Sequence, residues 1–179
     1  MRKVQGKGGE CDIAKKRKID IQPDHISAYK RKIMNYLNTN ERIVDLCRGE
    51  FGERQDYKLF YPYEYIPGTT ETTICDVCFE VLEDYSWTNT TFTNLSIFFF
   101  IICHYDIAHM PDEPGLRYDM IAHEIVKDFA GQDFMGLGNM RLVYNHAYTA
   151  TPEFRGRVLQ FSLFDISQET FNKHDWTII

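Results

Sequence analysis

The stretch FAGQDFMGLGNMRL, residues 129–142, places three glycines within eight residues, a density that could cradle a phosphate group. A phosphate-binding loop follows a strand and opens a helix, so that backbone N–H groups face the anion. Here the order is reversed, because the amphipathic segment LRYDMIAHEIVKDFA precedes Gly131 and the β-like segment RLVYNHAY follows Gly138. No Lys-Ser or Lys-Thr pair follows Gly136 or Gly138. We therefore predict a helix stop at Gly131 and a turn rather than a nucleotide site.

Cysteine and histidine suggest a second possible chemistry, the binding of zinc. Cys75 and Cys78 form a CxxC motif, and Cys103 is followed directly by His104. A structural zinc site needs its ligands on one side, whereas strand residues one or three apart point to opposite faces. A chain without a secretory signal is expected to keep its cysteines as free thiols. The pattern favours buried, unreactive cysteines, and a small metal-binding module is the alternative.

The motifs that could support catalysis are incomplete. The segment HEIVK at residues 123–127 begins like a zinc-protease helix but ends in Lys where the second His is required. His104, Asp106 and His109 form a loose group before a loop, which fits either a hydrolytic or metal role or a solvated polar cluster. No GxSxG nucleophile motif is present. We expect no enzymatic activity, no cofactor and no metal site.

Charge divides the chain into two parts. Residues 1–22 contain seven Lys/Arg and three Asp/Glu, whereas the remainder contains 13 Lys/Arg and 23 Asp/Glu. The acidic remainder argues against a general nucleic-acid-binding surface, because neutralising phosphates takes clustered basic side chains. The KKRK run at residues 15–18 is either solvated, a localisation signal or a small DNA-contacting arm. We expect a flexible basic tail at 1–22 and a single domain at 23–179.

The apolar run LSIFFFIIC, residues 95–103, is too short to span a bilayer, and no N-terminal segment resembles a secretory signal. We expect a soluble protein made in the cytoplasm without a membrane partner.

Periodicity predicts the elements that position these side chains. Apolar residues at helical spacing predict three helices, at residues 23–38, 41–49 and 116–130. Alternating or continuous β-rich apolar residues predict four strands, at residues 72–84, 95–105, 140–148 and 156–166. Residues 52–72 are expected to form an extended, aromatic-rich loop.

The first two expected strands form a hairpin, and the second, nearly all apolar, is expected to be a central strand covered on both faces. Helices segregated from hairpins indicate an α+β fold with an antiparallel or mixed sheet and helices packed on one face. The expected core consists of Val77, Phe79, Val81, Ile97, Phe99, Ile101, Ile121, Ile125, Phe129, Leu159, Phe161 and Leu163.

Four sequence segments, and their order along the chain, resemble those of the tail terminator, or tail completion, proteins of long-tailed bacteriophages. They are PYEYIPGTTETTICDVCFEV, LSIFFFIICHYDI, GLRYDMIAHEIVKDFAGQDFMGLGNMRLV and FRGRVLQFSLFDI. The resemblance covers residues 26–167, whereas residues 1–22 and the cysteine content depart from the family's pattern.

The resemblance implies a virion structural protein that assembles with itself into a ring, commonly of six subunits. Such a ring caps the head-proximal end of the tail tube, contacting the tail tube protein on one side and a neck or head-connector protein on the other. It would be located at the tail-neck junction of the virion. Another head-tail joining or neck protein is the nearest alternative.

A ring requires a patch on one subunit to meet a different patch on the next. Aromatic residues and Met are enriched at such interfaces, so apolar residues in loop tips are the first candidates. Tyr85 and Trp87 lie at the tip of the expected hairpin, and Phe134, Met135 and Leu137 lie in the glycine-rich turn. The alternative is that these side chains fold back onto their own core.

Overall fold

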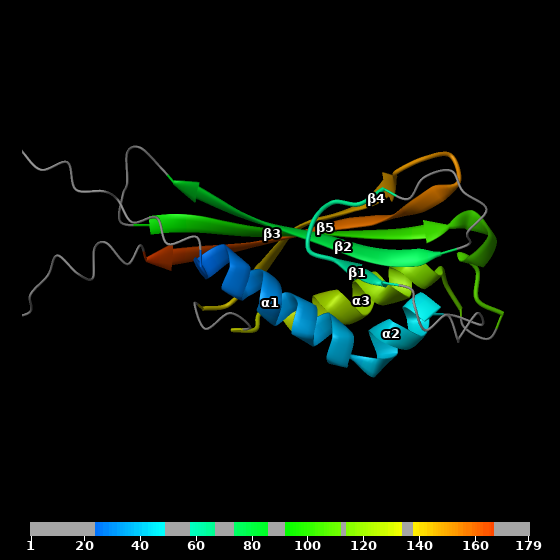
Figure 1. Cartoon of the computed structure of the whole chain (residues 1–179), viewed down its shortest axis with the longest axis horizontal. Helices are drawn as coiled ribbons and strands as arrows, with labels where there is room; N and C mark the ends of the chain where they lie inside the picture. Colours follow the sequence, from blue (N-terminus) through cyan, green and yellow to red (C-terminus); the bar gives the residue numbers. More distant parts are fainter. Residues whose placement is uncertain are drawn as a thin grey trace, which may run out of the picture.

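The computed structural model describes residues 24–48, 58–66, 74–85, 92–111, 114–133 and 138–166. Its elements are α1 (Asp24–Thr39), α2 (Glu41–Arg48), β1 (Phe60–Tyr61), β2 (Cys75–Tyr85), β3 (Phe92–His104), the 3-10 turn η2 (Tyr105–Ile107), α3 (Arg117–Phe129), β4 (Arg141–Thr149) and β5 (Phe154–Ile166). The three helices lie against one face of the sheet (Figure 1). The α+β class and the one-sided helix layer are thus confirmed.

The sheet has five strands in the order β1-β2-β3-β5-β4. β2 and β3 form the expected hairpin, with Cys75 opposite Cys103 and Tyr85 opposite Thr93. β5 lies between β3 and β4 and is antiparallel to both. β1 runs parallel to β2, which makes the sheet mixed. The two edges of the sheet are therefore a strand of two residues, β1, and a strand of nine residues, β4.

All twelve residues expected in the core are buried. Nine of them lie at every second position along β2, β3 and β5, and the other three are in α3. Because successive side chains on a strand point to opposite faces, these nine all face the helices. Phe129, the last residue of α3, is fully buried and its ring lies 5.1 Å from Phe99 and 5.0 Å from Tyr36. The helix-facing layer is thus closed around an aromatic cluster.

A polar junction fixes the three helices to one another. Asn40 lies between α1 and α2, and its Oδ1 accepts a hydrogen bond from the Ile43 backbone N–H at 3.1 Å, which caps α2. The Asn40 amide also donates to Asp128 at 3.1 Å, and the Tyr36 hydroxyl donates to the same carboxylate at 2.5 Å. Burial and the bond to Asp128 raise the pKa of Tyr36 well above its usual value. The junction therefore places a neutral Tyr36 against α3.

Two expectations from the sequence need correction. Residues 52–72 were expected to form an extended, aromatic-rich loop without a strand, but Phe60 and Tyr61 form a parallel strand with Val77 and Cys78. A strand of two residues carries no periodicity, so the sequence could not reveal it. The prediction that the central strand is covered on both faces holds only in part: on the face away from the helices, Ser96 and Ile102 in β3 are buried, whereas Phe98 and Phe100 are only partly buried.

Candidate functional site: an open sheet face and edge

The cysteines divide between the two faces of the sheet, as their spacing predicts. Cys75 and Cys103 face the helices, where they belong to the same buried cluster as Cys47 of α2. Cys78 lies on the other face, in a cluster with Tyr61 and Ile102. The CxxC motif is therefore split by the sheet, which is the expected result for residues three apart on a strand.

The three helix-side cysteines form a chain of thiols. Cys103 hydrogen-bonds to Cys75, and Cys75 in turn to Cys47. The bond to Cys75 and burial raise the pKa of Cys103 well above its usual value, so it stays protonated. On the opposite face, burial raises the pKa of Cys78 to about 12. Over the described residues, no three His, Cys, Asp or Glu side chains are placed to bind a metal ion together.

The His/Asp group at the end of β3 has a structural use. Nδ1 of His104 accepts a hydrogen bond from the backbone N–H of Asp106 at 3.3 Å, which caps η2. The His104 ring stacks on Tyr105, with 4.6 Å between centroids, and meets Phe154 edge-on. His109 forms a backbone bridge to Leu116 at the start of α3. These contacts assign the group to closing the β3–α3 connection.

The glycine-rich stretch behaves as a helix stop. Gly131 adopts a φ of 74°, the left-handed conformation that favours glycine, directly after α3. Its N–H donates to the Met140 carbonyl at 2.8 Å, and the Met140 N–H donates to Gln132 at 3.1 Å. The Gly138 N–H is taken by the Asp133 carboxylate at 2.9 Å. These three N–H groups are thus used within the turn.

The opening of α3 ties the helix layer together and connects it to the sheet. Arg117 is buried and donates to the carbonyls of Leu46 and Ile107, both at 2.9 Å. The Leu46 carbonyl is one of the last of α2, so the guanidinium satisfies a helix end that lacks an internal partner. Asp119 forms an ion pair with Arg157 of β5. The Arg-x-Asp pattern at residues 117–119 therefore acts as a structural clamp.

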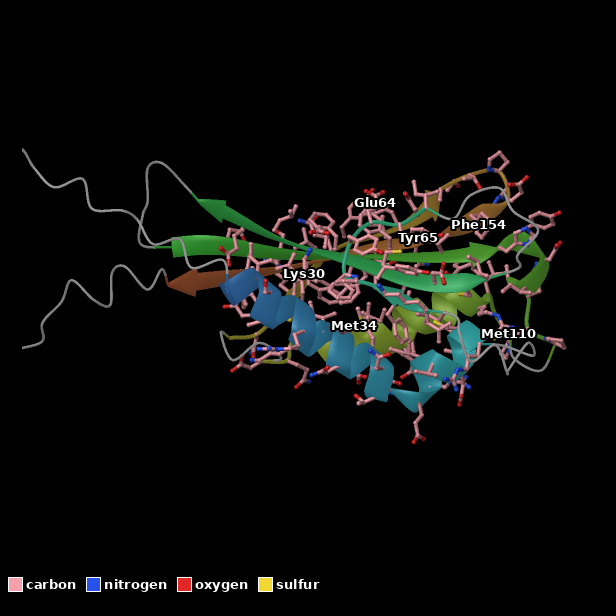
Figure 2. The ribbon with its side chains drawn as sticks, in the orientation of Figure 1. Lys30, Met34, Glu64, Tyr65, Met110 and Phe154 are labelled. Carbon is pink, nitrogen blue, oxygen red and sulfur yellow. The ribbon has the colours of Figure 1, made fainter. Side chains whose placement is uncertain are left out.

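Beyond the helix layer, the second sheet face is covered at one end by residues 61–66, here called the crossing segment. At its start, Lys30 of α1 donates to the Pro62 carbonyl at 2.9 Å and pairs with Glu80 at 2.5 Å. Further along, Glu64 accepts a hydrogen bond from the Tyr148 hydroxyl of β4 at 3.2 Å. Figure 2 shows Glu64 and Tyr65 on the side of the sheet opposite Met34 of α1. The segment thus runs from the β1 edge toward β4.

The described residues cover the rest of this second face only in part. Leu82 of β2 is 46% exposed, and the Phe98 ring stacks loosely on Phe100 with 6.4 Å between centroids. On β4, Tyr144 is 41% exposed and stacks on His146 at 4.0 Å. Among the described residues these apolar and aromatic side chains are exposed or only partly buried, and a contiguous exposed surface of this kind often marks an interaction site.

β4 is the most exposed strand of the sheet. Seven of its nine residues are exposed and the other two are half-buried. Val143, displaced by a bulge in the pairing with β5, is 55% exposed. Sequence reasoning missed this surface because RLVYNHAY alternates weakly and carries no sign of which strand becomes the edge. The strand order alone places it there.

The five residues predicted at a subunit interface are not brought together by the described structure. Tyr85 is the last residue of β2, and only its backbone is described. The remaining four, Trp87, Phe134, Met135 and Leu137, lie outside the described residues. Their assignment stays a prediction, as does any role of the 1–22 tail.

Fold and surface together define a two-layer α+β protein whose accessible features are a sheet edge and a partly uncovered sheet face. Among its described helices, none has the length and apolar character needed to cross a bilayer. A family model described as YomW matches residues 16–163, so the chain belongs to the YomW family. This membership indicates a phage-associated protein. Comparison with the curated proteins gives no significant match.

Proposed function

We propose that this phage-associated chain is a virion structural protein, a tail terminator that assembles into a ring on the head-proximal end of the tail tube. The observation that carries the proposal is the β4 edge of the sheet: this strand is exposed on both faces and includes the exposed side chains of Val143 and Tyr144. A subunit that works alone gains nothing from such an edge, whereas a subunit of a ring needs a surface for each neighbour.

The polar side chains that could take part in catalysis or metal binding form structural contacts instead, which supports a structural role for the protein. His104 and Asp106 close a turn, and Arg117 and Asp119 clamp α3 in place. Each of these side chains is therefore already used by the fold. The proposal accordingly assigns the chain neither a catalytic residue nor a cofactor.

The partners in this proposal are copies of the chain itself, in a ring of about six as the family resemblance implies, together with the tail tube protein and a neck or head-connector protein. The ring is located at the tail-neck junction of the virion. The acidic body, with 13 Lys/Arg against 23 Asp/Glu outside residues 1–22, leaves only the basic tail for contact with DNA.

Two measurements test the proposal. Full-length protein should elute as a single oligomer in size-exclusion chromatography with light scattering, and negative-stain images should show rings. Tails from a phage lacking the gene should be overlong, because nothing stops tube polymerisation. A monomer that leaves tail length unchanged would refute the proposal. Tails of normal length that fail to join heads would instead assign the protein to head-tail joining.

A further inference from the structure

Within the described part of the chain, the backbone of β4 has a side with no strand beside it, since β4 ends the strand order. The Ala150 N–H donates to the Phe154 carbonyl at 3.1 Å, so Ala150 is hydrogen-bonded to β5. Because the register is regular from Tyr144 to Thr149, this bond determines which residues of β4 direct their backbone groups toward β5 and which direct them away. In an antiparallel pair, every second residue exchanges both bonds with its partner and the intervening residues face away. Asn145, Ala147 and Thr149 therefore direct their N–H and C=O groups outward.

This edge has little of the protection that natural edge strands carry. Lysine, proline, short length or a covering element usually prevent an edge from pairing with another chain. β4 has nine residues, contains neither lysine nor proline, and is exposed on both faces. Its bulge affects only the start of the strand, between Leu142 and Tyr144. As far as the described residues show, the six residues after the bulge, 144–149, are therefore available for pairing.

The opposite edge of the sheet is covered only in part. β1 pairs with β2 at Val77 and Cys78, and the Lys30 side chain forms an ion pair with Glu80 next to them. Beyond this point β2 continues to Tyr85 without a strand on that side among the described residues. The odd-numbered residues of β2 face this edge, because the Val77 N–H donates to Leu59 across it.

The two edges differ in charge. The Val81–Tyr85 part of β2 contains Glu83 and Asp84 and no basic residue, whereas β4 contains Arg141 and His146 and no acidic residue. The other two acidic residues of β2 do not add to this difference, because Asp76 is buried and Glu80 is paired with Lys30. Pairing of β4 with a second β4 would bring like charges together, whereas pairing of β4 with β2 combines opposite ones. The difference favours a contact between unlike edges.

We infer that the β4 edge of one subunit pairs with the Val81–Tyr85 part of the β2 edge of a second copy, so that the sheet continues from subunit to subunit. β2 and β4 run in opposite directions within the sheet, because β2 and β5 are each antiparallel to β3 and β4 is antiparallel to β5. A neighbour in the same orientation therefore presents its β2 antiparallel to β4. Such a head-to-tail contact leaves one unused edge at each end until a ring closes. The inference rests on the proposed ring and names its contact.

A proline substitution tests the contact because it removes one backbone donor. Ala147→Pro deletes an outward N–H without touching a hydrogen bond to β5, and prolines are tolerated at edges where that N–H faces solvent. Ala147→Val keeps the N–H and serves as the matched control. In the full-length chain, Ala147→Pro should raise the concentration for half-assembly about tenfold or more, since a hydrogen bond is lost at every contact. Ala147→Val should assemble like the unmodified chain.

Hydrogen exchange followed by mass spectrometry provides the second readout, and it needs no substitution. Assembly should slow exchange in peptides covering 141–149 and 81–85, while peptides of the central β3 stay unchanged. A ring that forms in both Ala147 variants and leaves β4 exchange unaltered would overturn the inference while leaving the ring intact. Protection of β4 without β2 would overturn it in favour of β4–β4 pairing. An unmodified chain that stays monomeric would reject the ring itself.

Discussion

Phe129 closes the helix-facing core, and its truncation is the sharpest test of the fold. Its side chain is fully buried, and its ring lies 5.0 Å from Tyr36, 5.1 Å from Phe99 and 5.6 Å from Phe161. Deleting a buried phenylalanine costs about 3 to 5 kcal/mol through lost burial and the cavity left behind. The Tyr36 and Phe99 contacts are edge-on, and each such pair adds roughly 0.5 to 1.5 kcal/mol. We therefore expect Phe129→Ala to lower the free energy of unfolding by about 4 to 5 kcal/mol.

The expected loss is a large part of the total stability, because domains are stable by about 5 to 15 kcal/mol. Urea denaturation followed by circular dichroism measures it, and the melting temperature should fall by roughly 8 to 20 °C for a chain of this length. Phe129→Leu is the matched control: it retains most of the apolar volume and loses the ring contacts, so about 1 to 2 kcal/mol should be lost.

Phe98→Ala provides the comparison on the open face. Its side chain is only partly buried, so less apolar area returns to water and the loss should stay under about 2 kcal/mol. If Phe129→Ala costs less than about 1 kcal/mol, or no more than Phe98→Ala, then α3 does not pack on the sheet as described.

Three further predictions concern the interface, the buried cation and the thiols. Trp87→Glu or Met135→Glu should leave the circular dichroism spectrum unchanged and abolish the ring in size-exclusion chromatography with light scattering; if both variants still assemble, these residues are not at the interface. Arg117→Met should cost about 3 kcal/mol in urea denaturation because two buried carbonyls lose a charged donor, and Arg117→Lys should restore only part, since lysine lacks the guanidinium fork; an unchanged midpoint would contradict the clamp. At pH 8, Cys78 should react with iodoacetamide roughly a thousandfold more slowly than an ordinary thiol, because its pKa near 12 leaves little thiolate, and the rate should rise as pH increases; rapid labelling of the native protein, mapped by mass spectrometry, would show that Cys78 is not buried.

Local patterns were informative wherever one face of an element is buried. The alternation along β2 placed Val77, Phe79 and Val81 in the core, and the helical spacing of Ile121, Ile125 and Phe129 did the same for α3. Strand parity also separated Cys75 from Cys78. In each case the period of the element, about two or 3.6 residues, relates a residue type directly to a side of the element.

The candidate surface was much harder to predict. The sequence pointed to loop tips, at residues 85–87 and 134–137, because apolar residues there have no evident local use. It offered no sign that β4 becomes an edge exposed on both faces, or that the crossing segment covers only one end of the second face. Both features depend on which strands become neighbours.

The sequence by itself determined the types of the three helices and of β2 to β5, the α+β class, the helix stop at Gly131 and the burial of the twelve expected core residues. Only the tertiary structure decided the strand order β1-β2-β3-β5-β4, the chain of thiols from Cys103 to Cys47, and the burial of Arg117 against α2. The physical reason is the range of the interactions. Periodicity reports interactions between near neighbours in the chain, whereas β5 was inserted between β3 and β4 by hydrogen bonds between residues about 60 positions apart, as in the pairing of Phe99 with Leu159.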